Sequence, residues 1–365
     1  MSLVLFGCGG SESGNNLTQK ITNKSGNDTM QSDLDKNPIS PNFGGKFGQG
    51  FIYHFYSPSG KYYISMEGQV SQVDGWIYGE FFLVKDHNRK KIEGITWSQE
   101  PNLVELNHVL FLNENTALLN GNTLFDADDW RKTYVVPEEI NYIFTYDLSQ
   151  DKKKVAIYGK DEEGLGIWVV DLENMQSGKI FEPDFPEYVT EFKMACKWDI
   201  NNNLYFHAGY GGKPYIFKYS AKSGETVPYL ENALFPSPSP DGENIAYYQT
   251  TCFYSKNSDI PPKTFILDMK TGEKRVELAD FHYLIWAKDD PHVFACWNPC
   301  CGDRDTEPCL IVYKLTAWGA DEIFASKDVS PPIAGLSLSR DTIEFVELIW
   351  DEKGIRMGEF NRIKY

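Results

Sequence analysis

Short apolar runs and polar turns alternate along most of the chain. In one nine-residue stretch, Ser239–Tyr247, the polar residues Ser-Pro-Asp-Gly come before the apolar run Ile-Ala-Tyr. Pro240 fixes φ for the second position of a turn, Asp241 supplies a side-chain acceptor, and Gly242 tolerates a positive φ. The pattern therefore predicts the end of one strand, a tight turn and the start of the next strand.

The same pattern recurs at intervals typical of a repeat. Its copies start at residues 57, 111, 149, 198, 239, 287 and 337, so that successive starts differ by 54, 38, 49, 41, 48 and 50 residues. A second pattern follows several of these copies, an apolar run that leads into a turn with glycine, at Ile167–Leu172, Tyr215–Tyr219 and Phe265–Met269. A period of about 40–50 residues with four strand-like segments predicts the blade of a β-propeller.

The stretch Ser239–Tyr247 resembles the S-P-D-G-x-x-I-A-Y core of the TolB-like β-propeller repeat, a relative of the WD-type repeats. The resemblance implies an all-β fold, a seven-bladed propeller with four-stranded antiparallel blades. Six blades is the alternative, because the copy at Phe111 has the weakest turn. The last repeat ends at Tyr365 without a fourth strand, so we expect a segment within about residues 35–50 to complete the last blade.

Composition and charge support strands and narrow the choice of partner. Aromatic residues make up 15% of the 365 residues, and such side chains pack well on a pleated sheet. The formal net charge of −17 argues against nucleic acid, which would need a basic surface. We expect no cofactor, with an unlocalised divalent metal as the one alternative.

The first residues suggest a signal for export. Leu3–Cys8 is a short apolar run that ends in Gly-Cys, and it resembles the end of a bacterial lipoprotein signal peptide. Phe6 departs from the small residue usual at its position, and the basic segment is missing, so we expect a truncated signal. The polar stretch that follows predicts a flexible tether. We therefore assign residues 1–45 to signal and tether and residues 46–365 to one propeller domain, with lipidation of Cys8 as the hypothesis and a free thiol in a tail as its alternative.

Six more cysteines follow in the chain: Cys196, Cys252, Cys296, Cys300, Cys301 and Cys309. All but Cys196 are expected in or beside two long loops on one face, roughly 251–262 and 297–308. Disulfides in an oxidising compartment are the first interpretation, with Cys296–Cys309 closing the second loop and Cys252 joined to Cys300 or Cys301. Such a loop closure stabilises by roughly 3 kcal/mol in the chain-entropy model. Free thiols and a thiolate metal site remain as alternatives, and Cys196 is expected to be a small buried residue.

Three histidines are weak candidates for a metal site. His54 and His108 come three residues before their aligned turns, and His282 has the same parity in its repeat. First strands line the channel of a propeller, and some seven-bladed lyases of similar fold hold a divalent metal there with histidines. Histidines with satisfied nitrogens in a blade core are the alternative. The chain has no G-x-S-x-G, so a hydrolase of the prolyl oligopeptidase kind is not supported.

Binding is the remaining interpretation, and the two long loops are where we expect it. Aromatic and arginine side chains are common anchors of recognition surfaces, and the candidates on this face are Tyr210, Phe253, Tyr254, Trp297, Asp303, Arg304 and Asp305. The sequence thus predicts a non-enzymatic, monomeric platform that is lipid-anchored at the cell envelope and binds a protein, peptide or glycan. A metal-dependent polysaccharide lyase that uses the central pocket is the runner-up.

Overall fold

The computed structural model describes residues 51–70, 77–99, 108–184, 195–250, 263–278, 283–297, 310–326, 333–351 and 354–365. Residues Pro38–Tyr365 form one compact unit. The predicted boundary at residue 45 lies outside the described residues and stays a prediction. Every regular element among the described residues is a β-strand.

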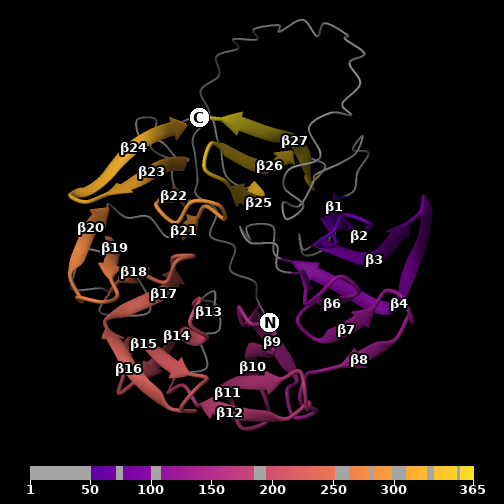
Figure 1. Ribbon diagram of the computed structural model, residues 1–365, viewed down its shortest axis with the longest axis horizontal. Helices are drawn as coiled ribbons and strands as arrows, with labels where there is room; N and C mark the ends of the chain where they lie inside the picture. Colours follow the sequence, from indigo (N-terminus) through magenta and orange to yellow (C-terminus); the bar gives the residue numbers. More distant parts are fainter. Residues whose placement is uncertain are drawn as a thin grey trace, which may run out of the picture. The chain divides into compact units, whose positions relative to one another are not determined.

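The strands form seven sheets in chain order (Figure 1). The first sheet contains β1 (Phe51–Tyr56), β2 (Tyr62–Val70), β3 (Ile77–Lys85) and β4 (Asn88–Gln99). The second contains β5 (Val109–Phe111), β6 (Thr116–Leu119), β7 (Thr123–Asp126) and β8 (Lys132–Tyr134). The third contains β9 (Tyr142–Leu148), β10 (Lys154–Lys160), β11 (Leu165–Asp171) and β12 (Ser177–Phe181).

The remaining sheets follow in the same way. The fourth contains β13 (Cys196–Trp198), β14 (Asn203–Tyr210), β15 (Lys213–Ser220) and β16 (Thr226–Glu231). The fifth contains β17 (Ala233–Pro238), β18 (Asn244–Gln249), β19 (Lys263–Asp268) and β20 (Lys274–Leu278). The sixth contains β21 (Tyr283–Trp286), β22 (Val293–Trp297), β23 (Leu310–Thr316) and β24 (Gly319–Ser326). The seventh contains β25 (Ile333–Leu338), β26 (Thr342–Asp351) and β27 (Gly354–Lys364).

Each sheet is an antiparallel meander in which sequential strands are neighbours. The pairing of the third with the fourth strand shifts register in five sheets, between Glu80/Phe82, Ile167/Trp168, Ile216/Phe217, Ile266/Leu267 and Val312/Tyr313. A bulge bends its strand and increases the local twist. The repeated bulge therefore gives successive sheets a similar strong twist at their outer edges.

Successive sheets pack face to face, and each sheet contributes to two cores. Strand β10 shows this most clearly, because side chains alternate between the two faces of a strand. Val155 and Ile157 belong to the core shared with the second sheet, whereas Ala156 and Tyr158 belong to the core shared with the fourth. Six such cores join the seven sheets from first to last among the described residues. The fold is a seven-bladed β-propeller with antiparallel blades, as predicted.

The second sheet, whose weak turn had suggested six blades, is a complete four-stranded sheet. Its first turn lacks the Pro-Asp-Gly pattern, but Asn113 replaces it, because its Oδ1 accepts the backbone N–H groups of Asn115 and Thr116, both at 2.9 Å. The seventh sheet has three strands among the described residues. The segment within about residues 35–50 that we expect to complete it lies outside them, so that prediction stays open.

The turns also correct the alignment of the repeats. In each sheet the first turn is closed by a backbone N–H that bonds to a carbonyl across it, from Ser57, Leu112, Ser149, Asp199, Ser239, Ala287 and Ser339. Three of these positions differ by one or two residues from the starts expected at 111, 198 and 337. The turns differ in length, since Asp199 bonds to Asn203, whereas Ser239 bonds to Asn244. A fixed nine-residue template therefore puts the start of some copies one or two residues too early.

Candidate functional site

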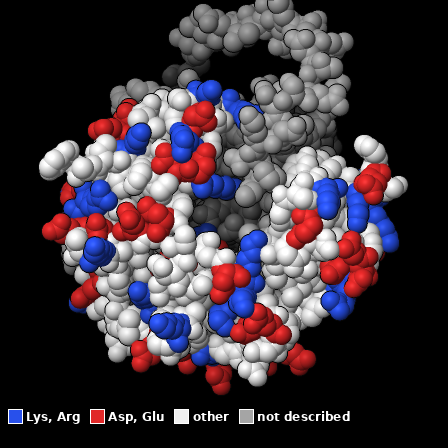
Figure 2. Space-filling view, in the orientation of Figure 1, with Lys and Arg blue, Asp and Glu red and all other residues white. Residues whose placement is uncertain are grey.

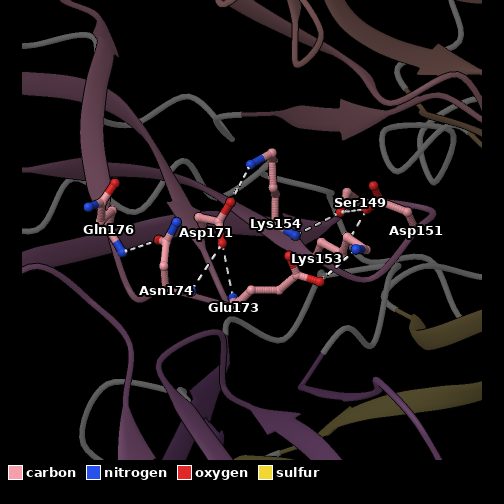
Figure 3. A network of polar contacts seen from close by, with 8 residues as sticks. All are labelled: Ser149, Asp151, Lys153, Lys154, Asp171, Glu173, Asn174 and Gln176. Carbon is pink, nitrogen blue, oxygen red and sulfur yellow. Dashed lines mark hydrogen bonds and ion pairs between the residues drawn. The ribbon is translucent and has the colours of Figure 1, made fainter.

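In each four-stranded meander two turns lie at the same end of the sheet, the first turn (between the first and second strands) and the third turn (between the third and fourth). In the third sheet they are joined by a polar network (Figure 3). Lys154 Nζ lies 2.7 Å from Asp171 Oδ2, and the backbone N–H of Leu172 donates to the carbonyl of Lys153 at 2.8 Å. The hydrogen bond from Lys154 holds the pKa of Asp171 below its usual value. The turns are thus fixed to one another rather than independent.

The same connection between the first and third turns recurs within the fourth sheet and within the fifth. The N–H of Ala221 donates to the carbonyl of Asn202 at 3.3 Å, and that of Met269 donates to the carbonyl of Glu243 at 2.8 Å. First turns of neighbouring sheets also touch, since the N–H of Asp151 donates to Asn202 Oδ1 at 3.3 Å. Backbone hydrogen bonds within and between sheets therefore leave the turns little freedom to move.

A cavity of about 380 Å³ lies among these turns of the fourth and fifth sheets. We call it the turn pocket. It is lined by Asp199, Asn201, Asn203, Tyr205, Lys218, Tyr229, Gly242, Glu243, Asp268, Met269 and Lys270. These residues come from the first turn and three strands of the fourth sheet and from both turns of the fifth.

Asp199 shapes one wall of the turn pocket. It stands where four other sheets have serine, at positions 57, 149, 239 and 339. Its Oδ1 accepts the N–H groups of Asn201 and Asn203, both at 2.8 Å, and its Oδ2 accepts Asn203 Nδ2 at 2.9 Å. These bonds offset the cost of burying a carboxylate that is only 2% exposed.

Tyr205 lines the turn pocket and is completely buried. Its ring meets the ring of Tyr229 edge to face at 5.2 Å, which fixes its orientation. Burial, followed by the nearby carboxylate of Asp199, raises the pKa of Tyr205 well above its usual value. The phenolic oxygen makes no hydrogen bond of normal geometry with a described residue, and the carboxylate of Asp199 is near enough to act on it as an acceptor. A buried hydroxyl without a well-formed hydrogen bond is costly, and it is the feature of this cavity that calls for a ligand or a water.

The charged side chains of the turn pocket are of both signs. Lys218 Nζ lies 5.8 Å from the centre of the Tyr205 ring and makes no ion pair with any described residue. Asp268 Oδ1 accepts the N–H groups of Lys270 and Thr271, both at 2.9 Å, and the bond from Thr271 is the main cause of its lowered pKa. Because both bonds go to Oδ1, Oδ2 keeps acceptor capacity.

Sequence reasoning missed this site. The stretch Ser239–Tyr247 was predicted only as a tight turn between two strands, yet Gly242 and Glu243 line the turn pocket. One signal was present in the sequence, the acidic Asp199 in place of the serine of other copies. The alignment hid that signal, because it set Trp198 rather than Asp199 at the serine position.

The two described candidates for metal binding, His54 and His108, do not belong to a donor set among the described residues. His108 is buried, its Nδ1 lies 3.1 Å from Asn120 Oδ1, and burial lowers its pKa to about 4. The ring of His54 stacks on Tyr63 at 4.6 Å. His282 lies outside the described residues. Over the described ranges no group of three or more His, Cys, Asp or Glu side chains is placed to hold a metal ion. Those residues alone therefore do not fit the metal that the lyase alternative needs.

A fourth histidine, His207 on β14, was not anticipated. It is fully buried, and burial lowers its pKa to about 3. Its Nδ1 accepts the backbone N–H of Phe235 at 3.3 Å, and the two rings meet edge to face at 5.1 Å. Phe235 has a φ of 53° at a register shift of β17. The neutral imidazole thus supports an irregular stretch of the fifth sheet.

Most of the predicted binding residues fall outside the described part of the chain. These are Phe253, Tyr254, Asp303, Arg304 and Asp305. Trp297 ends β22, and its side chain is not described. Tyr210 ends β14, is 57% exposed, and meets Tyr215 and Phe217 edge to face at 6.0 and 6.1 Å. The predicted recognition face is thus represented by a single described side chain.

The described cysteines lie in cores. Cys196 is fully buried between the third and fourth sheets, as predicted. Cys296 is fully buried between the fifth and sixth sheets, and burial raises the pKa of its thiol. Cys296 is a free thiol in the structure, so the predicted Cys296–Cys309 disulfide is not formed there. Cys252, Cys300, Cys301 and Cys309 lie outside the described residues, so the pairing of Cys252 with Cys300 or Cys301 stays a prediction.

The surface shows no segregation of charge on the face visible in Figure 2, where Lys and Arg side chains are interspersed with Asp and Glu. Within the described residues there is no helix long and apolar enough to cross a membrane.

Comparisons with known proteins agree with the fold. No protein-family model and no curated protein matches the chain. Among solved structures it is similar to an oligogalacturonate lyase in complex with manganese (12% identity, 88% of this chain and 98% of that chain, TM-score 0.52). It is also similar to an oligogalacturonate lyase from Vibrio parahaemolyticus (12%, 84% and 87%, 0.50) and to TolB from Acinetobacter baumannii (12%, 82% and 81%, 0.39). At these identities the likeness concerns the fold alone, which is that of β-propeller proteins.

Proposed function

We propose that the protein is a binding platform of the cell envelope, exported and lipid-anchored through Cys8, which holds a protein, peptide or glycan without transforming it. The observation that carries this proposal is the buried hydroxyl of Tyr205, which makes no hydrogen bond of normal geometry with a described residue and belongs to a side chain that lines a cavity of about 380 Å³. A cavity of this volume is within the range of small-molecule sites.

The chemistry of the turn pocket supports holding a ligand rather than moving its protons. The raised pKa of Tyr205 keeps its hydroxyl protonated, so it serves as a donor near neutral pH. The lowered pKa of Asp268 keeps that carboxylate charged, so it serves as an acceptor. A general acid or base works best with a pKa near the working pH, and neither group is tuned in that way.

Equilibrium dialysis of the purified chain against glycan and peptide fractions of bacterial envelopes tests the proposal. We expect one fraction to be retained, and its component to be recovered chemically unchanged. Retention should weaken in Lys218→Glu, which reverses one charge of the turn pocket. The matched control is Lys213→Glu, because Lys213 is an exposed residue of the same strand that pairs with Glu231 outside the pocket. Equal retention by all three proteins would show that the ligand binds elsewhere.

The metal-dependent polysaccharide lyase is the competing outcome, and the fold of the manganese-bound oligogalacturonate lyase is what favours it. Incubation with polygalacturonate and Mn²⁺ tests it directly. Formation of unsaturated products that is lost in His54→Ala would establish the enzyme and overturn the platform. Recovery of the intact polysaccharide is the result expected here.

A further inference from the structure

We infer that the turn pocket binds a neutral sugar unit, an inference that rests on the proposed binding function and names the ligand of the same site. Three observations lead to this class of ligand: the mixture of donors and acceptors, the balance of charge, and the aromatic wall.

The donors and acceptors of the turn pocket suit a ligand that bears several hydroxyl groups. Tyr205 Oη is a protonated donor without a hydrogen bond of normal geometry, and Lys218 Nζ is a second donor without an ion pair among the described residues. Glu243, which is exposed and likewise makes no ion pair with a described residue, and Asp268 Oδ2 are acceptors. A sugar hydroxyl donates and accepts at once, so neighbouring hydroxyls can satisfy both kinds of group.

The balance of charge disfavours a small ion. The lining contains three carboxylates, Asp199, Glu243 and Asp268, and two ammonium groups, Lys218 and Lys270. The Asp199 carboxylate is already bonded to Asn201 and Asn203. The remaining groups are two carboxylates and two ammonium groups, so the pocket has no net potential that would attract an anion or a cation.

The aromatic wall suits the C–H face of a sugar ring. Tyr229 is half-buried, lines the turn pocket, and is held in place by its edge-to-face contact with Tyr205. Aromatic side chains supply contact area at a small cost in conformational entropy. The cavity is at the lower end of the range of roughly 300–1,000 Å³ for ligand sites, which limits the ligand to a small unit.

The turn pocket is already formed before a ligand arrives. Asp199 is fixed by three hydrogen bonds, and the turns of the fifth sheet are joined by the bond between Met269 and Glu243. Preorganised groups lose little freedom on binding, so weak polar contacts can add up to measurable affinity.

Calorimetric titration of the full chain tests the inference with glucose, galactose, N-acetylglucosamine and their disaccharides. Galacturonate and putrescine serve as anionic and cationic probes. We expect saturable binding of at least one neutral sugar, and about a tenfold weaker Kd in Tyr205→Phe, which removes one hydrogen bond to the ligand. Tyr158→Phe is the matched control, because its buried hydroxyl also lacks a hydrogen bond of normal geometry but does not line the turn pocket. Its Kd should equal that of the wild type.

Three results would overturn the inference. The first is binding of galacturonate or putrescine in preference to every neutral sugar. The second is an unchanged Kd for the sugar in Tyr205→Phe. The third is no binding of any probe, together with a crystal structure in which only an ordered water contacts Tyr205. In each case retention of an envelope fraction in the dialysis experiment decides separately whether the protein is a binding platform.

Discussion

Gly242 and Ile200 approach so closely that a Cβ on Gly242 would lie 2.8 Å from Ile200 Cγ2. The first turns of the fourth and fifth sheets are therefore in direct contact beside the turn pocket. Gly242 also has a φ of 71°, which favours glycine. Two separate requirements for glycine, conformation and space, meet at one position of the repeat.

Gly242→Ala should therefore lower the free energy of unfolding by about 2 kcal/mol, as the sum of a positive φ and a close contact. Gly224→Ala is the matched control, because Gly224 has a φ of 73° and nothing within 4 Å of its Cβ position. It should cost only about 1 kcal/mol. Urea unfolding measures the free energy of unfolding of both variants. The double variant Gly242→Ala/Ile200→Ala should lose the extra cost that the close contact adds to Gly242→Ala. Equal losses in the two single variants would contradict the contact.

Removal of the buried hydroxyls should not weaken the fold. The hydroxyls of Tyr158 and Tyr205 make no hydrogen bond of normal geometry with a described residue, and each bears the cost of leaving water without a full replacement. We expect Tyr158→Phe and Tyr205→Phe each to raise the free energy of unfolding by about 1 kcal/mol, or to leave it unchanged, in the absence of ligand. A loss above 1 kcal/mol in urea unfolding would reveal a hydrogen bond to the hydroxyl.

Stability should fall as the pH is lowered from about 6.5 towards 5. The folded-state pKa is about 4 for His108 and about 3 for His207, below the usual 6.5. In this window the unfolded chain binds protons at both histidines and the folded chain does not. Each histidine then lowers the free energy of unfolding by about 1.4 kcal/mol for each pH unit. This pH window lies above the usual pKa range of carboxylates, so the histidines dominate the change. His207→Gln should therefore reduce the slope of the free energy of unfolding against pH. The same slope in the variant and the wild type would contradict the lowered pKa of His207.

Residues 35–50 should matter for stability. Strand β27 is the outer strand of a three-stranded sheet among the described residues, and a propeller is stable only when its blades are complete. A chain that starts at residue 51 should melt several degrees lower than the full chain, whereas one that starts at residue 35 should melt with it. Equal melting temperatures for all three would show that residues 35–50 do not complete the sheet.

Non-reducing peptide mapping should find Cys296 as a free thiol rather than linked to Cys309. Its burial and raised pKa should protect it from alkylation until the protein unfolds, so we expect it to be alkylated in urea without a reductant and not in the folded protein. Recovery of a Cys296–Cys309 peptide would contradict the free thiol.

The repeat could be read from the sequence because its turn chemistry is local. Pro240, Asp241 and Gly242 act within one turn, so the pattern survives in every copy that keeps those residue types. Asn113 keeps the function of the turn with different residues, which is why the second sheet gave a weak signal. Local patterns thus predicted the number of sheets but not the exact starts of their turns.

The turn pocket could not be predicted in the same way. Asp199, Lys218 and Asp268 belong to different turns and strands, and only the packing of two sheets brings them together. Nor does the sequence show that the hydroxyl of Tyr205 lacks a well-formed hydrogen bond, because Tyr205 looks like any aromatic residue of an apolar run. Its role depends on neighbours that are far away in the chain.

Strand β10 has a further consequence for how such a protein can change over time. Val155 and Ala156 are adjacent in the chain, yet they belong to different cores. If a repeat were duplicated, both faces of its sheet would pack against new neighbouring sheets, and the side chains in the two new cores would not be complementary at first. The repeat is thus the unit that a gene can copy, whereas the junction between two repeats is the unit that selection must refine.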